Sequence, residues 1–354
     1  MWQNVKLKKV VNNIILFLLC IPLYGIHSVI MALDQGHYLF VHNEEHMIDT
    51  SRRELYPHSN GHPYREVKVH FWYPINDDKN SVILFSHGLG PNFDGMSYQW
   101  LCEYLASQGY VVVSVSHSYG CKLIELSEKG SVADYLYPVP SLHYQPGRDM
   151  FDVELETWIN DMLYVLNQCE RYNNRGTSFL FNKLNMESVA MIGHSLGGST
   201  AVQVCRRDSR VKAAITLDGP LYGKYADTPF DKPVLFIMGV LGQGSVDMKN
   251  DKVVSQAFFW SWYMKTNVFP VIDRFFSAMR QNVWKVIVSG FVHEIFTDQG
   301  PDVLLKPWLI DHEQAHVIIM SYVQEFLDCY VKGHCNTSLE KLTIQWPEVM
   351  VEKK

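Results

Sequence analysis

Seven short apolar runs stand out along the chain, each bounded by turn-forming residues. They cover residues 66–74, 81–88, 109–117, 188–193, 211–219, 232–239 and 283–290. The first run alternates polar and apolar positions. The others are nearly continuous apolar segments, which is typical of central strands that are covered on both faces. The pattern therefore predicts a sheet whose inner strands are buried between two layers.

Helical patterns separate several of these runs. Residues 98–109 place apolar side chains at helical spacing and end on a glycine, residues 152–169 are amphipathic, and residues 312–333 form a long segment near the end of the chain. Apolar positions three and four residues apart are typical of a helix with one face on a core. Strands that alternate with helices indicate βαβ units, so we expect an α/β protein with a mostly parallel central sheet and helices on both faces.

The first 33 residues follow a different pattern. Lysines precede an apolar run over residues 14–25, and with His27 counted as neutral no charged side chain then occurs before Asp34. A basic start and a short apolar core are typical of a secretory signal, and the uncharged interval is also long enough, at about 20 residues, to span a bilayer. We expect residues 1–33 to be a cleaved signal peptide or a retained membrane anchor, with a buried helix as the remaining alternative. Either of the first two makes the protein an exported one, secreted or periplasmic, whose single domain covers residues 34–354.

Charge and cysteine content narrow the classes of protein. The chain of 354 residues has a net charge of −6, which argues against nucleic acid as a partner. No Cys-Xaa-Xaa-Cys pair or His/Cys cluster suggests a metal site, so no metal and no cofactor is expected. Six cysteines follow residue 33, and an even number fits disulfides in an exported protein. Cys329 and Cys335 are close enough to pair, while buried free thiols are the alternative.

Residues 189–200, VAMIGHSLGGST, carry the clearest candidate chemistry. An apolar strand runs into a Gly-Xaa-Ser-Xaa-Gly turn centred on Ser195, and a helical pattern follows. In a sharp strand-to-helix turn of this kind, Gly193 and Gly197 keep side chains away from the serine, so that its hydroxyl projects above the sheet. The context favours Ser195 as a nucleophile over a serine that merely occupies a tight turn.

A serine nucleophile also needs donors for the oxyanion that forms when it attacks. One donor is expected to be the backbone N–H of Leu196, at the positive end of the helix that follows the turn. The second is expected from the loop after residues 81–88, where FSHGLGPN places the Leu89 N–H near the same point. The alternative is that these glycines only form a turn.

The base and the acid should follow the serine, each just past a strand. His293 comes after the run that ends at residue 290, whereas the histidines within residues 37–70 are expected to precede the core sheet. For the acid that orients the base, the order of residues along the chain leaves two candidates. Asp218 ends the strand after the nucleophile, and Asp247 lies in a Gly-rich loop beyond the next one.

The ordered set LFSHGLG, YVVVSVSH, VAMIGHSLGG, VKAAITLDG, KPVLFIMG and VIVSGFVHEIFTD resembles the platelet-activating factor acetylhydrolase family of α/β-hydrolases. This family comprises the lipoprotein-associated phospholipases and their bacterial relatives, and the chain looks like a relative of the bacterial type. The likeness covers roughly residues 36–330. It implies an α/β-hydrolase fold and the catalytic set Ser195, Asp218 and His293, and so selects Asp218 over Asp247. It also implies oxyanion donors from Leu89 and Leu196.

The resemblance implies a serine esterase that works without a cofactor, through an acyl-enzyme. Short or oxidised acyl groups of phospholipids would be its substrates. A broad carboxylesterase, lipase or polyester hydrolase is the alternative within enzymes. A catalytically inactive hydrolase fold that serves as a binding module is the alternative from another class.

The chain departs from the family at two places. The residues just after Asp218 read GPLYG, where the family often has bulky aromatics. The segment before His293 is enlarged, and residues 255–280 are dense in Phe, Trp, Tyr and Met. Two interpretations stay open: a helical insertion packed on the core, or a cap whose apolar face meets acyl chains, a membrane or another lipid surface. The candidate cap residues are Phe258, Trp262 and Phe276.

Overall fold

The computed structural model describes most of the chain and leaves the expected N-terminal leader outside. The described residues are 37–53, 63–90, 93–117, 150–222, 228–241, 264–301, 305, 309–335 and 338–354. Among them, no helix is long and apolar enough to cross a membrane.

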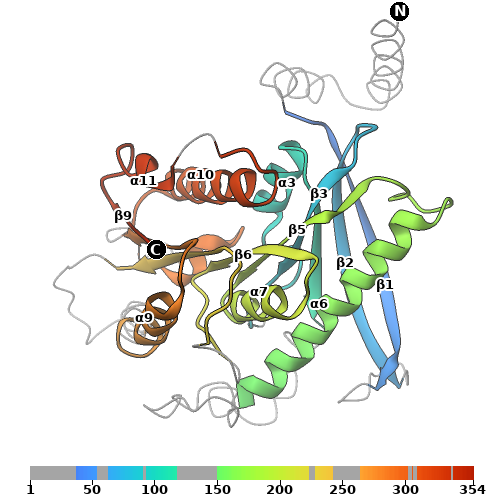
Figure 1. Ribbon diagram of the computed structural model, residues 1–354, viewed down its shortest axis with the longest axis horizontal. Coiled ribbons are helices and arrows are strands. Elements are labelled where there is room, and N and C mark those ends of the chain that lie inside the picture. Colours follow the sequence, from blue (N-terminus) through green and yellow to red (C-terminus); the bar gives the residue numbers. More distant parts are fainter. Residues whose placement is uncertain are drawn as a thin grey trace, which may run out of the picture.

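One twisted sheet of nine described strands runs through the molecule (Figure 1). Their order across the sheet is β1-β2-β4-β3-β5-β6-β7-β8-β9. Their bounds are β1 Phe40–Arg53, β2 Tyr64–Pro74, β3 Asn80–Ser86, β4 Val111–His117, β5 Leu184–His194, β6 Val211–Leu217, β7 Val234–Val240, β8 Val283–Ser289 and β9 Val349–Lys353. The six strands from β4 to β8 in this order pair in parallel, whereas β1, β2 and β9 pair antiparallel at the two sides.

Helices cover both faces of the sheet. Their bounds are α3 Gln99–Ser107, α6 Met150–Asn174, α7 Leu196–Arg207, α9 Phe269–Ala278, α10 His312–Tyr330 and α11 Leu339–Leu342. The helices α6, α7 and α9 pack on one face, and α3 and α10 pack on the other. All seven residues of β3 are buried, as its continuous apolar run predicts. These observations confirm the expected α/β-hydrolase architecture.

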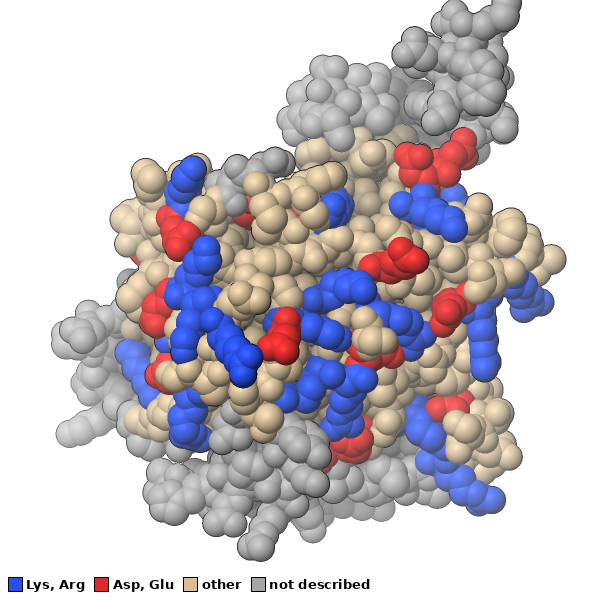
Figure 2. Space-filling model, viewed as in Figure 1, with Lys and Arg blue, Asp and Glu red and all other residues tan. Residues whose placement is uncertain are grey.

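The face that α6 and α7 occupy carries many charges. Figure 2 shows Lys and Arg side chains among Asp and Glu across this face. Arg207 forms a bidentate ion pair with Glu156, with N–O distances of 2.7 and 2.9 Å. Arg210 forms ion pairs with Glu170 at 2.9 Å and with Asp208 at 2.6 Å. The basic side chains of this face are therefore balanced, in part, by acidic neighbours.

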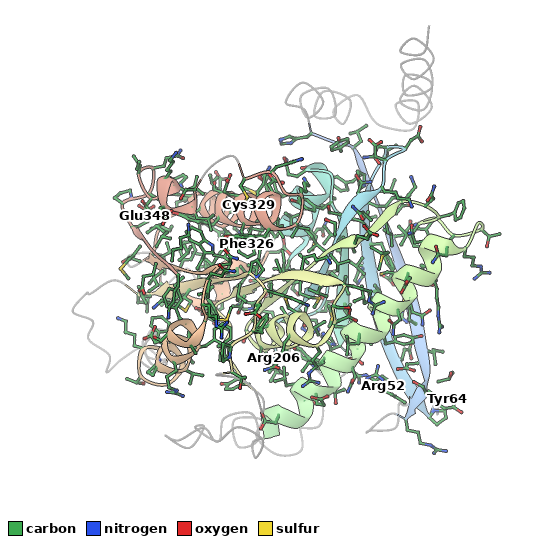
Figure 3. The ribbon with its side chains drawn as sticks, in the orientation of Figure 1. Arg52, Tyr64, Arg206, Phe326, Cys329 and Glu348 are labelled. Carbon is green, nitrogen blue, oxygen red and sulfur yellow. A yellow bond between two sulfur atoms is a disulfide. The ribbon has the colours of Figure 1, made fainter. Side chains whose placement is uncertain are left out.

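The described cysteines divide between a disulfide and buried free thiols, the two states expected from the sequence. Cys329, in the last turn of α10, forms a disulfide with Cys335 in the segment that follows, close to the buried Phe326 (Figure 3). Three others are buried free thiols: Cys102, Cys169 and Cys205. One expectation is wrong: residues 40–53 do not precede the sheet but form its edge strand β1, which pairs with β2 from Phe40 to Arg53.

Candidate active site

Ser195 lies between β5 and α7, where the backbone turns sharply. Its φ of 53° and ψ of −123° place it in a region that L-residues with side chains rarely adopt. The turn is tight because a Cβ on Gly193 would overlap the carbonyl group of Gly197. The Ser195 N–H donates to Leu217 O at the end of β6, at 3.0 Å, which anchors the turn to the neighbouring strand. The sequence motif therefore folds as a strand–turn–helix elbow.

The elbow also lies directly against the loop that follows β3. A Cβ on Gly197 would overlap the carbonyl oxygens of Ser86 and His87. A Cβ on Gly88 would lie 3.2 Å from the Ser195 Cβ. Only glycines permit this approach, so the loop that contains Leu89 reaches the vicinity of the candidate nucleophile.

Asp218 and His293 meet at the same edge of the sheet. His293 Nδ1 and Asp218 Oδ2 are 2.7 Å apart, and the other carboxylate oxygen, Oδ1, accepts the Gly239 N–H at 3.0 Å. Asp218 follows β6 directly, and His293 begins the 3₁₀ turn His293–Phe296 after β8. A carboxylate can only accept, so Nδ1 of His293 carries the hydrogen and Nε2 is left as the basic nitrogen.

The electrostatic environment adjusts the basicity of His293. Burial lowers the pKa of His293, but the hydrogen bond to Asp218 and the negative charges of Asp218 and Glu294 raise it by more. The pKa of His293 therefore lies above its usual value of 6.5. The Asp218 side chain is 3% exposed, so its charge acts on His293 with little screening by water.

One candidate oxyanion donor belongs to the elbow itself, and the other belongs to the loop after β3 that packs against it. Leu196 is the first residue of α7, and the first N–H groups of a helix have no partner within that helix. Leu89 follows Gly88, whose N–H donates to the Tyr98 hydroxyl at 3.0 Å. Backbone N–H groups beside a nucleophilic serine can stabilise negative charge on a carbonyl oxygen, and this role of Leu89 and Leu196 stays a prediction.

Sequence reasoning missed a buried chain that links the three loops of the site. Tyr98 Oη lies 2.7 Å from His194 Nδ1, and His194 Nε2 lies 3.0 Å from the His293 carbonyl oxygen. Because a carbonyl only accepts, His194 donates through Nε2, accepts from Tyr98 at Nδ1 and is neutral. Burial holds the pKa of His194 well below its usual value, which agrees with the neutral form. Tyr98 lies in the turn before α3 and belongs to no motif. Its position ten residues after Gly88 is the one sequence feature that could have identified it as a member of the site.

Several of the expected site residues fall elsewhere. Asp247, Phe258 and Trp262 lie outside the described residues. Phe276 is on α9, half-buried, with its ring 4.8 Å from the Nζ of Lys285. Its neighbours Ile272 and Phe275 are buried in the core beneath α9. The described part of the insertion thus packs on the sheet, and its role as a cap stays a prediction.

The described residues hold no group of three or more His, Cys, Asp or Glu side chains that could bind a metal ion.

A comparison with protein families decides the relationship that these motifs indicated. The model of platelet-activating factor acetylhydrolase, isoform II, matches residues 68–123 and 170–311, which is more than half of the chain. The chain belongs to this family. The matched residues take in Leu89, Ser195, Asp218 and His293 of the candidate site.

Individual relatives are distant. A platelet-activating factor acetylhydrolase of Cavia porcellus is 25% identical over 77% of this chain and 61% of its own length. A probable 1-alkyl-2-acetylglycerophosphocholine esterase of Arthroderma benhamiae is 21% identical over 80% and 70%, respectively. The chain thus spans about three fifths of the Cavia protein.

A solved structure gives the same fold. The ferulic acid esterase of Streptomyces cinnamoneus superposes with a TM-score of 0.63 over 89% of this chain and 96% of its own, at 19% sequence identity. At this identity the likeness supports the α/β-hydrolase fold alone.

Proposed function

We propose that this protein is a serine hydrolase that cleaves carboxylic esters through an acyl-enzyme. The observation that carries the proposal is the 2.7 Å contact between His293 Nδ1 and Asp218 Oδ2, beside the elbow that holds Ser195. In this arrangement His293 Nε2 accepts the hydroxyl proton as Ser195 Oγ bonds to the ester carbonyl carbon. Asp218 keeps Nδ1 protonated and stabilises the imidazolium that forms.

The rest of the cycle uses the same groups. The carbonyl oxygen becomes an oxyanion, which the N–H groups of Leu196 and Leu89 stabilise. Collapse of this intermediate expels the alcohol, which takes the proton from His293 and leaves the acyl group on Ser195. A water molecule, deprotonated by His293, then attacks the acyl carbon, and the acid is released with Ser195 regenerated. No cofactor takes part.

We infer that the substrates are phospholipids with short or oxidised acyl groups. Family membership supports this class, as do the names of the relatives, an acetylhydrolase and a 1-alkyl-2-acetylglycerophosphocholine esterase. We also propose that the protein is exported and meets its substrate at a membrane or other lipid surface. The basic, then apolar start of the chain before Asp34 supports export. N-terminal sequencing of the protein recovered from its host would show whether the leader is cut before residue 34.

A fluorophosphonate probe followed by a substrate panel tests the activity. The probe should label wild-type protein at Ser195 and leave Ser195→Ala unlabelled. The panel holds one phospholipid head group and varies the acyl chain from acetyl upwards, beside simple soluble esters of the same acids. Preference for short acyl chains on phospholipid supports the proposal, whereas equal turnover of all the simple esters indicates a broad carboxylesterase. Absence of labelling and turnover would mean a binding module and would refute the proposal.

A further inference from the structure

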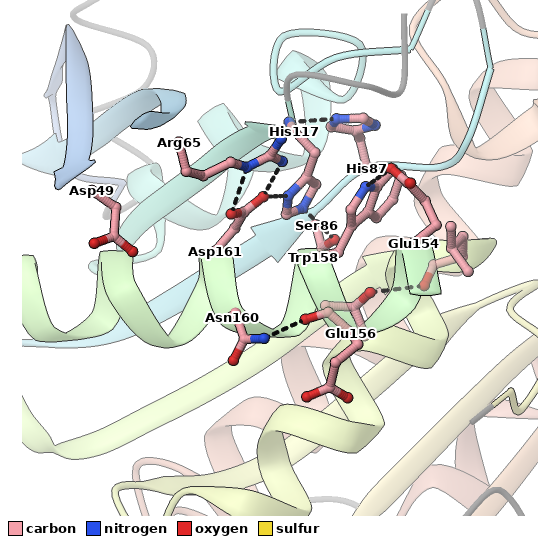
Figure 4. Close-up of polar contacts among 12 residues, drawn as sticks. Asp49, Arg65, Ser86, His87, His117, Glu154, Glu156, Trp158, Asn160 and Asp161 are labelled. Carbon is pink, nitrogen blue, oxygen red and sulfur yellow. Dashed lines mark hydrogen bonds and ion pairs between the residues drawn. The ribbon is translucent and has the colours of Figure 1, made fainter. Parts of the chain in front are cut away.

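A buried polar network adjoins the loop that carries Leu89. It links Asp161 of α6, His117 at the end of β4, and Ser86 and His87 at the end of β3 (Figure 4). All four side chains are fully buried or nearly so. None of the four is one of the proposed catalytic residues Ser195, Asp218 and His293.

The hydrogen bonds of His87 determine its tautomer. Its Nε2 lies 3.0 Å from the backbone nitrogen of His117, whose N–H can only donate, so Nε2 is the acceptor. Its Nδ1 lies 2.6 Å from the carbonyl oxygen of Gly88, which can only accept, so Nδ1 carries the hydrogen. Burial and the neighbouring His117 lower the pKa of His87 to about 3, so the ring remains neutral.

The remaining members of the network hold the His117 end in place. His117 Nδ1 donates to Asp161 Oδ2 at 2.9 Å, and its Nε2 accepts from the Ser86 hydroxyl at 3.0 Å. Arg65 donates to both oxygens of Asp161, from Nε at 2.9 Å and from a terminal nitrogen at 2.5 Å. Burial raises the pKa of Asp161, but Arg65 and His117 lower it by more, so Asp161 stays ionised.

Aromatic packing fixes the two histidine rings. Trp158 of α6 stacks on His117 with ring centres 4.3 Å apart and an angle of 8°, and its ring centre is 4.9 Å from that of His87. Close packing against Trp158, together with hydrogen bonds at both ring nitrogens, restricts rotation of the His87 ring and so holds the direction of its Nδ1–H.

That direction matters because of the peptide group it contacts. The Gly88 carbonyl and the Leu89 N–H belong to one planar peptide unit and point to opposite sides of it. Fixing the carbonyl oxygen therefore fixes the direction of the N–H. The Gly88 N–H donates to the Tyr98 hydroxyl at 3.0 Å, so the peptide groups before and after Gly88 are both restrained.

We propose that His87, held by His117 and Asp161, is a positioning residue that orients the Gly88–Leu89 peptide and so aims the Leu89 N–H at the oxyanion. The inference rests on the proposed ester-hydrolase function. It assigns the buried network a part in transition-state stabilisation, at one remove from the reacting atoms.

Two substitutions at one position separate positioning from packing. The amide nitrogen of His87→Asn stands near the place of Nδ1 and can still donate to the Gly88 carbonyl, but it leaves the His117 N–H without an acceptor. The amide of His87→Gln stands near Nε2 and can accept from the His117 N–H, but it leaves the Gly88 carbonyl without a donor. We expect His87→Gln to lose about tenfold to a hundredfold in kcat with KM little changed, and His87→Asn to stay within about fivefold of wild type.

A transition-state analogue supplies a readout that packing alone would not change. A boronic acid or trifluoromethyl ketone forms a tetrahedral adduct on Ser195 and uses the same oxyanion donors. Its inhibition constant should rise in His87→Gln by the same factor as kcat/KM falls, while both stay near wild type in His87→Asn. The control is His70→Gln, because His70 is a buried histidine of β2 outside the site. It should lower thermal stability and leave both constants unchanged.

Each outcome decides a different claim. An active wild type with equal kcat for the two His87 variants would overturn the positioning role alone. A wild type that neither turns over esters nor binds the analogue would overturn the proposed function and this inference with it. If the variants do not fold, long-range ¹H–¹⁵N spectra of the wild type decide: a proton on Nε2 of His87 instead of Nδ1 would contradict the inference.

Discussion

Ser195 and Asp218 are both held at positive φ, at 53° and 47°, at the ends of the adjacent parallel strands β5 and β6. A side chain in this backbone region costs about 1–3 kcal/mol. The Ser195 N–H bonds to Leu217 O, the residue before Asp218, so the two strained residues support each other across the strand pair. Two of the three proposed catalytic residues are strained, and few other described positions are. This is consistent with a site in which the positions of catalytic side chains are maintained at a cost in folding stability.

Replacing the strained serine should therefore separate stability from activity. Ser195→Gly removes the side chain that disfavours φ of 53°, whereas Ser195→Ala keeps a Cβ there. We expect Ser195→Gly to be more stable than Ser195→Ala by about 1 kcal/mol in urea unfolding. Both variants should lose turnover by several orders of magnitude, to what binding and the oxyanion donors supply. Equal stability of the two would argue against backbone strain at this position.

The assignment of the acid can be tested by two amide substitutions. Asp218→Asn should fold normally because asparagine tolerates the left-handed region, but it removes the charge that stabilises the His293 imidazolium. In serine proteases the same change lowers turnover about ten-thousandfold, and we expect a loss of that order here. Asp247→Asn should stay within about tenfold of wild type. The two variants are compared by their turnover of one soluble ester, with circular dichroism as the folding control. If Asp247→Asn were the inactive variant and Asp218→Asn stayed active, Asp247 would be the acid.

The raised pKa of His293 predicts a pH dependence. The neutral ring is the base, so kcat/KM should fall on the acid side with a midpoint above 6.5, the usual value for histidine. Removing the charge in Asp218→Asn should move the midpoint of the residual activity to lower pH. An unchanged midpoint would mean that another group controls the acid limb.

The same shift has a consequence for stability, with a definite sign. A pKa raised in the folded state means that protonated His293 favours folding. The contribution is complete below the unfolded pKa and is lost as pH rises through the folded pKa. The difference in unfolding free energy between wild type and Asp218→Asn should therefore shrink as pH increases across this interval. Urea titrations at several pH values would measure it.

The aromatic insertion leads to a comparison of substrates. If residues 255–280 form a cap, serine in place of Phe258, Trp262 or Phe276 should reduce hydrolysis of aggregated lipid more than that of a soluble short ester. A matched control is Phe181→Ser, since Phe181 is 48% exposed on the loop after α6. For Phe276, loss of its contact with Lys285 adds a decrease in stability. Equal losses on both substrates, with a lowered Tm, would identify the segment as core.

The disulfide after α10 should contribute a small amount of stability. Cys329 and Cys335 are six residues apart, and the entropy of closing so short a loop corresponds to about 2 kcal/mol. The double substitution to serine should lower the free energy of unfolding by this amount and leave turnover unchanged. Reduction of the wild type should have the same effect, and no effect of either would show that the loop is already restrained in the unfolded chain.

The fold could be predicted from the sequence where burial is two-sided. Each central strand is covered on both faces, so its continuous run of apolar residues identifies it in the sequence. The edge strands β1 and β9 were not predicted, because they have no such run. Only Met47 and Asp49 are buried in β1, so its HNEEH stretch resembles a loop, and β9 is too short to show a pattern.

For the site, too, only the part formed by residues close together in the sequence could be predicted. The elbow at Ser195 is encoded within a few residues, so the motif and its strand–helix context predicted it. The buried network could not be predicted, because His117 and Asp161 are 44 residues apart and His87 and His117 are 30 apart. Only the pairing of β3 with β4 and the packing of α6 on them bring these side chains together.

The antiparallel strand β9 protects the sheet against pairing with another copy of this chain. It pairs with β8, a nearly continuous apolar strand that would otherwise expose unpaired N–H and C=O groups at the edge of the sheet. The new border is short and ends in Glu352 and Lys353, and the opposite border, β1, carries Glu44 and Glu45. Ionic borders of this kind discourage strand-by-strand growth into fibres. Ending the chain before Val349 would remove this cover from β8, and we expect the shortened protein to aggregate.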